Sequence, residues 1–468
     1  MKTLIINPPC EYGLDRNGRW PAKVVGGTIV EPLFLAYATA VLEKQGMEVE
    51  LIDCPPLFVT RQDLLNRINK NIGLVAMQVA IPTFLQDIET AKQIKEKFPN
   101  IKIVLLGPHA TATDKEILEK NQCVDFIARG EYDYTVADMA KCILEKRNPQ
   151  NVLGISFIKD SRFFRSDSRP LIENLDELPF PARHFLPMEK YFEPVFKSKK
   201  TYRVFGSRGC PFSCIFCLWP QTMFGRKIRL RKPEKIVDEI EYLMKNYGAK
   251  GIYFEDDTFT VNPSYVFWVC QEILKRKIKI KWSCLGRVDC VSEEMLKKMK
   301  GAGCVTIRYG VESSSQEILD RSNKKIKVSQ IIKAFEITKK AGIENYADYA
   351  FGLPGETKET MKNTIDFAIK LDSDFAQFSV MVPYPGTELF EIAKKNNWLK
   401  TDDNNNFILD YPHLKAEEIA CYSKKAYRKF YFRPKYIFKK GISIKSFSEI
   451  PQLIKGGLNI MVNSYFKS

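Results

Sequence analysis

The stretch Gly209-Cys210-Pro211-Phe212-Ser213-Cys214-Ile215-Phe216-Cys217 places three thiols in one short loop. Thiolates are the protein ligands of iron–sulfur clusters, and these tight spacings let one loop reach three corners of a cubic cluster. The fourth iron is then left open for a substrate, as in catalytic metal sites. A zinc site would need another Cys or His nearby, and the next cysteine is distant, at Cys270. The loop therefore predicts a 4Fe-4S cluster on Cys210, Cys214 and Cys217, with zinc or merely buried cysteines as the alternatives.

This loop resembles the cysteine motif of the radical S-adenosylmethionine (SAM) superfamily, Cys-x-x-x-Cys-x-aromatic-Cys, and matches it in full. The resemblance implies that the open iron binds the amino and carboxylate groups of SAM and that Phe216 lies against the adenine. It also implies an external one-electron reductant of the flavodoxin or ferredoxin type. The enzyme would cleave SAM to a 5′-deoxyadenosyl radical that takes hydrogen from an unactivated carbon.

Length and composition are those of a protein with two or three domains: 468 residues, 45% of them hydrophobic. The remaining cysteines are scattered and do not form a disulfide framework, which favours a reducing compartment. The N-terminus reads as a strand rather than a signal peptide, and no stretch is apolar for long enough to span a bilayer. We therefore expect a cytoplasmic protein. The net charge of +16 is compatible with binding to nucleic acid, an anionic membrane or an anionic substrate, and charge alone does not distinguish these partners.

Residues 1–150 alternate short β-rich runs with amphipathic helical stretches. This alternation predicts βαβ units and a doubly wound parallel sheet of the flavodoxin-like type. Ligands of such sheets bind at the carboxyl ends of the strands. Neither a Gly-x-Gly-x-x-Gly fingerprint nor a phosphate loop ending in Gly-Lys-Ser/Thr is present. The expected strands are residues 3–7, 49–53, 74–79, 103–107 and 126–129.

These first 150 residues resemble the cobalamin-binding domain that precedes the radical SAM domain in one large subfamily. The resemblance rests on Leu106-Gly107-Pro108-His109-Ala110-Thr111 and on Arg129-Gly130-Glu131. An Asp-x-His-x-x-Gly pattern, which supplies an axial histidine in some cobalamin enzymes, is absent. We therefore expect His109 to line the pocket without necessarily binding cobalt, which would leave the cobalt to its surrounding shell. The residues implied to contact cobalamin are Gly107, His109, Thr111, Gly130 and Glu131.

Residues 151–195 are polar and proline-rich, and they predict an extended linker. From 196 to 400 the β-α alternation returns six times, which predicts a (β/α)6 partial TIM barrel. In β/α barrels the chemistry belongs at the C-terminal ends of the strands. The expected strands are residues 202–205, 251–255, 281–285, 306–310, 346–351 and 375–382.

Polar residues follow each expected strand of this barrel. SAM presents a sulfonium cation, an ammonium group and a ribose diol, which require carboxylates or other acceptors. Singly, an acidic pair such as Asp256-Asp257 could simply cap a helix. Together, the strand ends predict SAM contacts by Glu255, Asp256, Asp257 and Glu312. Arg287 suits the carboxylate of SAM or a phosphate-bearing partner.

Residues 401–468 form a basic, aromatic extension that we expect to be mainly helical. The segment from Lys424 to Lys440 interleaves cations with aromatic rings, which suits a membrane surface, RNA or a flap over the active site. A helix packed on the barrel with a solvated basic face is the alternative. Similar endings occur in members of the resembled subfamily that act on lipids and tetrapyrroles. This implies a hydrophobic small-molecule substrate and contact with the inner face of the membrane.

The combined resemblance implies a cobalamin-dependent radical SAM enzyme that transfers a methyl group from methylcobalamin to an unactivated carbon. A relative that forms a ring or adds oxygen remains an alternative. A methylthiotransferase, another alternative, would carry a second set of three cysteines in the first domain. Only Cys10 and Cys54 could belong to such a set, and the expected third cysteine is not evident. A metal-stapled RNA-binding protein is the non-enzyme alternative, but no RNA-binding module is recognisable and we expect no nucleic-acid partner.

Overall fold

The computed structural model describes residues 1–10, 14–15, 22–23, 29–193, 198–402 and 406–442. Its first domain contains a seven-stranded sheet in the order β4-β1-β5-β6-β7-β8-β9. The first five strands in this order are parallel, which is the flavodoxin-like arrangement that the sequence predicts. They are β4 (Val49–Asp53), β1 (Lys2–Asn7), β5 (Ile72–Gln78), β6 (Lys102–Leu106) and β7 (Phe126–Ala128).

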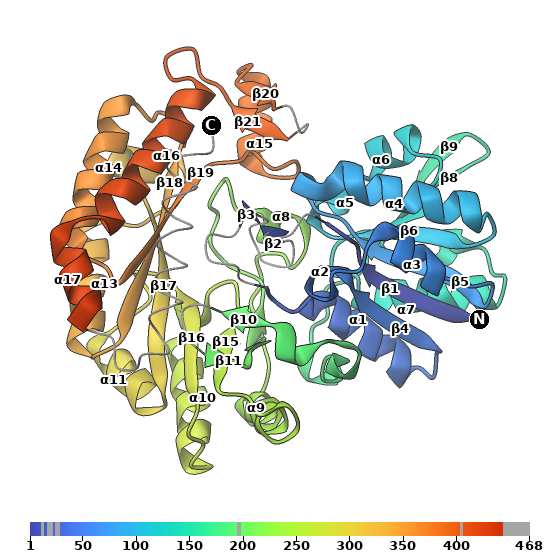
Figure 1. The fold of residues 1–468 in the computed structure, drawn as a ribbon, viewed down its shortest axis with the longest axis horizontal. Coiled ribbons are helices and arrows are strands. Elements are labelled where there is room, and N and C mark those ends of the chain that lie inside the picture. The colour runs from blue at the N-terminus through green and yellow to red at the C-terminus, as the bar shows by residue number, and fades with distance from the viewer. Residues whose placement is uncertain (11–13, 16–21, 24–28, 194–197, 403–405, 443–468) are drawn as a thin grey trace.

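Side chains of this sheet alternate between two separate cores because successive strand residues point to opposite faces. Leu4 and Ile6 belong to a core under α3 (Arg61–Arg67) and α4 (Phe84–Lys97). Ile5 belongs to a second core, with α1 (Leu33–Lys44) and α7 (Asp133–Leu144), that continues into the next domain. The α1 and α7 face of the first domain therefore packs against the second domain (Figure 1).

The first sheet continues further along the chain than the sequence indicates. Strand β8 (Ile155–Lys159) pairs antiparallel with β7, and β9 (Arg162–Arg165) pairs antiparallel with β8. Residues 151–165, predicted as part of a linker, thus belong to the first domain. The polar residues that suggested a linker lie instead in a hairpin at the edge of the sheet. Charged side chains at such an edge discourage pairing with another chain.

The second domain is an open barrel of six parallel strands, with neighbours in chain order. Its strands match the predicted ones within a few residues, so the predicted (β/α)6 partial barrel is confirmed. Helices α9 (Pro233–Tyr247), α10 (Pro263–Lys275), α11 (Glu293–Gly301), α13 (Val328–Lys340) and α14 (Lys358–Leu371) lie outside the sheet (Figure 1). The strands are β12 (Thr201–Val204), β15 (Gly251–Phe254), β16 (Lys281–Gly286), β17 (Cys304–Glu312), β18 (Glu344–Phe351) and β19 (Phe375–Val380).

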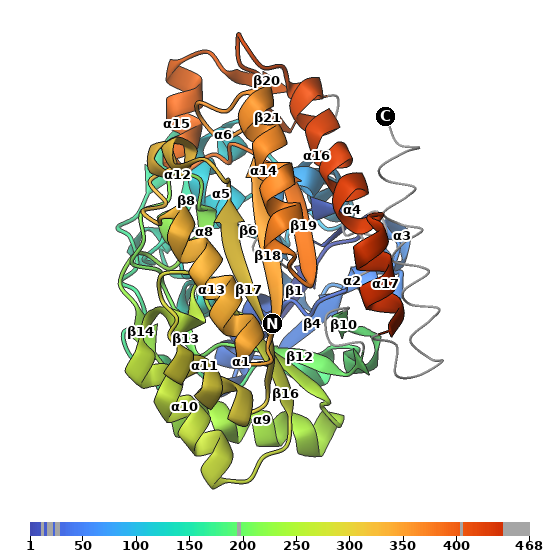
Figure 2. The same ribbon diagram turned by 90° about the vertical axis from the view of Figure 1, so that its left-hand side faces the viewer.

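The C-terminal extension begins with a hairpin of β20 (Leu399–Thr401) and β21 (Phe407–Leu409) and continues as α16 (Ala416–Tyr431) and α17 (Pro434–Ile442). Helix α16 lies along β19 and α14 (Figure 2). The Tyr431 hydroxyl bonds to the backbone of Ala376 on β19. The described part of the basic, aromatic segment is therefore a helical layer on the barrel. Residues 443–468 lie outside the described residues.

Candidate functional site

The loop that carries the three cysteines leaves β13 (Ser207–Arg208) and returns through α8 (Leu218–Thr222) to β14 (Arg229–Leu230). Strands β13 and β14 pair antiparallel and close the base of this cluster loop. Gly209 has φ +95°, and a Cβ at this position would lie 2.2 Å from the carbonyl oxygen of Lys227. Only glycine fits here, because such a contact requires the backbone to move. Cys210 and Cys214 are buried and Cys217 is half-buried.

Two of the three predicted acidic residues at the end of β15 hold the backbone that leads into this loop. Asp256 accepts hydrogen bonds from the amide of Gly206 (3.0 Å) and from the hydroxyl of Ser207. Asp257 accepts one from the amide of Gly209 at 2.9 Å. The structure thus gives these two carboxylates a role in positioning the loop. The contact with SAM that the sequence predicts for them stays a prediction.

Two cations lie beside the buried cysteines. Nη1 of Arg287 is 3.9 Å from Sγ of Cys214. Nζ of Lys324 is 2.7 Å from Oε1 of Glu312 and 5.9 Å from the ring centroid of Phe216. Burial would lower the pKa of Lys324, but Glu312 and the sulfur of Cys214 outweigh it and raise that pKa. Sequence reasoning identified Arg287, Glu312 and Phe216 but missed Lys324, because nothing in its local sequence signals a place beside the thiols.

Glu312 is held in an unusual backbone conformation. Its φ is +62°, in the left-handed region, and the pairing of β17 with β18 shifts register between Gly310 and Glu312. A non-glycine residue in this region is uncommon and costs free energy that the surroundings must offset. The bulge directs the Glu312 carboxylate to Lys324, and it places both groups near the cluster loop.

The cysteine triad fits a cluster better than a single metal ion. Within the described residues, no group of three or more His, Cys, Asp or Glu side chains converges on one ion. Each thiolate of a cubic cluster binds a different iron, so its sulfurs need not converge in this way, whereas zinc ligands must. The charge of nearby Arg287 and Lys324 suits thiolate ligands. Cys290, which sequence reasoning did not single out, lies close enough to Cys210 for that sulfur's charge to contribute to a raised pKa.

The predicted cobalamin edge lies at the end of β6. Gly107 has φ +110°, and a Cβ there would lie 3.2 Å from the carbonyl oxygen of Val79. The hydroxyl of Thr111 accepts a hydrogen bond from the amide of Gly130 at 3.0 Å. That bond ties the loop after β6 to the turn after β7. The glycine leaves the sheet edge without a side chain, which suits a bulky planar ligand.

His109 in this edge is neutral at pH 7, and its side chain is half-buried. Burial lowers its pKa to about 4, and its ring packs edge-on against Phe84 with centroids 4.7 Å apart. Its Nδ1 atom is buried and makes no hydrogen bond within the described part of the chain. An unpaired buried nitrogen is costly unless something binds it. The edge therefore offers a polar atom that a cofactor could use.

Glu131 follows Gly130 in the sequence, but its carboxylate bonds to residues outside the cobalamin edge. Its Oε1 accepts from Arg208 at 2.8 Å, and its Oε2 accepts from Arg229 at 2.6 Å. The amide of Ile172 also donates to Oε2 at 2.8 Å. Both oxygens of Glu131 are thus bonded to protein groups of the second domain and of the segment before it. These bonds give the carboxylate a role in the contact between the domains, and the cobalamin contact predicted for this residue stays a prediction.

The two predicted cofactor regions touch. Helix α5 (Pro108–Ala112), which holds His109, contacts α8, which directly follows Cys217. The hydroxyl of Thr111 lies 3.8 Å from Sδ of Met223. A Cβ added at Gly386 would lie 2.7 Å from Cβ of Ala112 and 2.8 Å from Cγ2 of Thr222. The segments that contain Ala112, Thr222 and Gly386 therefore meet between the cobalamin edge and the cluster loop.

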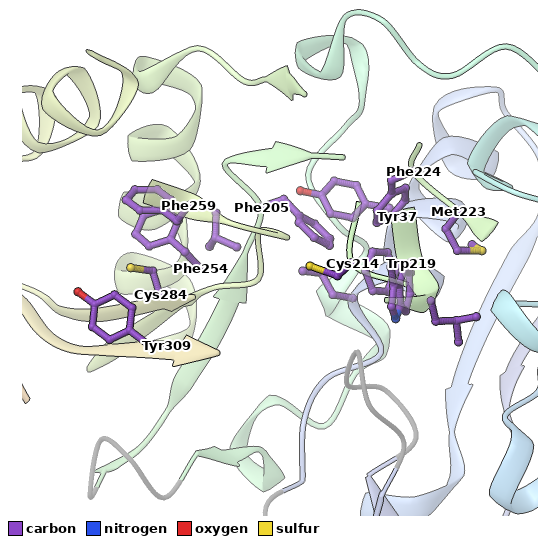
Figure 3. Close-up of a cluster of buried hydrophobic side chains, with 14 of the residues drawn as sticks. Tyr37, Phe205, Cys214, Trp219, Met223, Phe224, Phe254, Phe259, Cys284 and Tyr309 are labelled. Atoms are coloured by element: carbon purple, nitrogen blue, oxygen red, sulfur yellow. The ribbon is translucent and has the colours of Figure 1, made fainter. Parts of the chain in front are cut away.

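Aromatic side chains fill the domain contact behind these loops. The ring of Phe34 stacks on Trp219 with centroids 4.4 Å apart and lies 4.8 Å from Phe205. Figure 3 shows Tyr37 of α1 beside Phe224, with Cys214 and Trp219 of the second domain adjacent. Large buried rings give an interface much apolar area and a defined geometry. The loops at its edge therefore have fixed relative positions.

The inner wall of the barrel is polar and partly accessible. On β18 and β19 the outward residues Tyr349 and Phe378 are buried, whereas the inward Asp348 and Gln377 are partly exposed. Arg308 of β17 pairs with both oxygens of Asp348 at 2.6 and 2.7 Å and donates to Gln377 at 2.7 Å. Interiors of packed barrels are filled by branched apolar residues. This part of the wall is instead lined by hydrogen-bonded polar side chains that stay partly exposed.

Comparison with known proteins identifies both domains. Residues 204–368 match the model of the Radical SAM superfamily, and residues 20–140 match that of the B12 binding domain. An uncharacterized methyltransferase of Pyrococcus horikoshii is 34% identical over 452 residues, covering 94% of each chain. An anaerobic magnesium-protoporphyrin IX monomethyl ester cyclase of Cereibacter sphaeroides is 29% identical and covers 92% of this chain and 71% of its own.

Solved structures share the fold of the whole chain. The cobalamin-dependent SAM radical enzyme OxsB has a TM-score of 0.74 at 17% identity, covering 99% of this chain and 72% of its own. The radical SAM methyltransferase TsrM of Kitasatospora setae has a TM-score of 0.69 at 17% identity, covering 93% of this chain and 84% of its own.

Proposed function

Because this chain belongs to the family of radical SAM enzymes that carry a B12-binding domain, we propose that it methylates an unactivated carbon of a small molecule. Its cofactors are a 4Fe-4S cluster, SAM and cobalamin. When bound, these groups supply a carbon-centred radical and a methyl group, while the protein positions and shields them.

Named residues would hold these groups. Cys210, Cys214 and Cys217 would ligate the cluster, and Asp257 holds the loop that carries them. Arg287 and Lys324 offset negative charge beside the thiolates, and either is placed to take a carboxylate. Glu312, turned inward by its bulge, is the acceptor that we assign to SAM. Gly107, His109, Thr111 and Gly130 would line the cobalamin site.

The observation that carries the proposal is the contact between α5 and α8. Methyl transfer requires both cofactors to reach one substrate carbon, and reacting groups must be held within about 3–3.5 Å of each other. A barrel rim that faces the cobalamin edge supports such an arrangement. Gly386 packs closely against both Ala112 and Thr222, since a Cβ added to it would lie 2.7 and 2.8 Å from their side chains.

Anaerobic reconstitution tests the proposal without knowledge of the substrate. The purified chain would be loaded with iron, sulfide and hydroxocobalamin, freed of unbound cofactor, and incubated with reductant and SAM carrying a CD3 group. We expect a retained corrinoid, formation of 5′-deoxyadenosine and a labelled methyl group on the cobalamin. Corrinoid that is retained but never methylated would favour ring formation or oxygenation. Absence of corrinoid would contradict the proposal.

The substrate that we propose lies against the inner barrel wall. Nη1 of Arg308 makes no hydrogen bond to another described residue, so its N–H donors are available to an oxygen acceptor. A guanidinium is well suited to carbonyl, carboxylate or phosphate oxygens. The sequence led us to expect a hydrophobic substrate. The wall supports one that carries an oxygen acceptor at the end nearest Arg308.

A radical SAM enzyme needs a reductant, and we propose a flavodoxin or a ferredoxin. We also propose peripheral contact with the inner face of the membrane through α17, where Ile437 and Phe438 are 56% and 72% exposed beside Lys435. No helix in the described ranges is long and apolar enough to cross a membrane. Co-sedimentation with anionic lipid vesicles, compared with a Phe438→Glu variant, tests this contact: equal sedimentation of the two proteins would contradict it.

A further inference from the structure

The base of the cluster loop holds two buried arginines directly opposite one another. In the antiparallel pair of β13 and β14, Arg208 faces Arg229, and their side chains are each 1% exposed. Like charges directly opposite in a sheet are destabilising, and burial removes the water that would screen them. We call this pair of residues the neck of the cluster loop. The neck cannot close without negative charge supplied by another part of the chain.

That charge comes from the first domain. One carboxylate, that of Glu131, spans both arginines, with Oε1 2.8 Å from Nη1 of Arg208 and Oε2 2.6 Å from Nη1 of Arg229. Asp133 adds a two-point contact to Arg208 at 2.8 and 3.1 Å. Burial would lower the pKa of Arg208, but these two carboxylates outweigh it and raise that pKa. Two buried cations are therefore balanced by two buried anions.

The arginines are also fixed by neutral groups. The guanidinium of Arg208 lies 5.0 Å from the ring centroid of Phe224 and 5.2 Å from that of Tyr37. Arg229 donates to the carbonyl oxygens of Ile172 and Phe224 at 2.8 and 3.0 Å. Planar guanidinium groups held at several points have little freedom to reorient. The neck therefore has one geometry as long as Glu131 is present.

Glu131 stands between the two cofactor regions along the chain. It directly follows Gly130, whose amide is bonded to Thr111 in the cobalamin edge. Arg208 precedes Gly209, whose amide is bonded to Asp257, and Cys210 comes next. We infer that Glu131 is a positioning residue: it closes the neck of the cluster loop and fixes that loop relative to the cobalamin edge. The inference rests on the cofactor placement in the proposed function.

Net stability is a poor explanation for this arrangement. Desolvation of buried ion pairs consumes most of their attraction, so apolar replacements of similar volume are often neutral or stabilising. What a bridged pair of arginines provides is a defined geometry. The chain also contains a matched comparison: the side chain of Glu31 is buried to nearly the same degree and pairs with Arg183 at 3.1 Å. It likewise crosses the domain contact, where it accepts a hydrogen bond from the amide of Arg203 on β12. Glu31 bonds to no residue of the neck or of the cluster loop in the described structure.

The experiment compares Glu131→Gln with Glu31→Gln in anaerobically reconstituted full-length protein. Glutamine keeps the shape of the side chain and removes its charge, which leaves the neck with an excess positive charge. The first readout is the rate at which a chelator removes iron. The second is the magnetic dipolar coupling between the reduced cluster and bound cob(II)alamin, which reports the distance between the cofactors.

For Glu131→Gln we expect iron loss about tenfold faster, as for loss of one charge-assisted hydrogen bond of ordinary strength. We also expect a broader distribution of dipolar couplings than in the wild type. Glu31→Gln should leave both readouts unchanged even if it lowers the unfolding temperature. If Glu131→Gln fails to fold, Glu131→Gln combined with Arg229→Met restores the charge balance without the bridge, and it should still broaden the couplings.

Equal iron loss and equal couplings in the wild type and the folded Glu131 variant would overturn the inference. The same holds if Glu31→Gln changes both readouts as strongly. A wild-type protein that retains no corrinoid would instead contradict the proposed function. Iron loss would then still decide whether Glu131 closes the neck.

Discussion

Nη1 of Arg287 lies 3.9 Å from Sγ of Cys214, and the guanidinium stands 3.7 Å from the ring centroid of Phe212 in the same loop. Arg287 is itself buried and follows directly after β16. A fixed cation beside a cluster ligand stabilises the form of the cluster that carries more negative charge, which is the reduced form.

Replacing Arg287 by Met should therefore lower the reduction potential of the cluster, on the order of tens of millivolts. Redox titration followed by electron paramagnetic resonance measures this shift. Arg287→Lys keeps the charge and should fall between the wild type and Arg287→Met. A potential that is the same in all three proteins would show that this cation does not act on the cluster.

Cys290 offers a sharp test of the open iron position. Burial, the charge of Asp289 and that of Cys210 raise its pKa to about 12, so its thiol stays protonated at neutral pH in the absence of metal. We expect Cys290→Ala to bind as much iron as the wild type, and alanine at Cys210, Cys214 or Cys217 to lose most of it. Iron and sulfide analysis after reconstitution measures both.

A fall in iron content in Cys290→Ala would mean that Cys290 is the fourth ligand. That result would remove the open position on which SAM binding depends. Cys270→Ala, at a buried cysteine in α10, serves as the control for effects of cavity formation alone.

Glu356 predicts a stability that changes with pH. Burial raises its pKa from 4.5 to about 8, against two hydrogen bonds from the amides of Gly352 and Leu353, and its Oε1 has no partner among the described residues. The folded state therefore favours the protonated carboxyl. The contribution of Glu356 to the free energy of unfolding is fully present below about pH 4.5 and is lost as the pH rises toward 8.

Glu356→Gln should remove this loss. Each unit of pKa shift corresponds to about 1.4 kcal/mol, so the variant should gain a few kcal/mol over the wild type between pH 5 and pH 8. Denaturation midpoints at the two pH values test this, with exposed Glu359→Gln on α14 as the control. A difference between Glu356→Gln and the wild type that does not change with pH would contradict the prediction.

His109 should line the cobalamin site without titrating in the ordinary range. Because burial holds its pKa at about 4, the ring is neutral from pH 5 upward, and hydroxocobalamin affinity should not change between pH 5 and pH 8. His109→Ala should weaken binding through the lost packing on Phe84 but leave the electron paramagnetic resonance spectrum of bound cob(II)alamin unchanged. Nitrogen splitting that disappears in His109→Ala would instead show that this histidine binds cobalt.

The sequence alone determined the architecture, and it was enough to predict the three cluster ligands. The alternation of strands and helices, and with it the fold class of both domains, follows from periodic apolar runs, because such patterns depend on local geometry that repeats along the chain. Three cysteines within one loop need no tertiary information either. The hairpin of β8 and β9 was missed because its edge is polar, and edge strands lack the apolar pattern of central ones.

Only the tertiary structure decided which partner each polar residue has. Glu131 lies beside Gly130 in sequence, yet its carboxylate reaches Arg208 and Arg229, far along the chain in the second domain. Lys324 likewise comes to Glu312 and the thiols through a turn that no local pattern signals. Hydrogen bonds and ion pairs act over a few ångströms in space, and separation along the chain does not encode those distances.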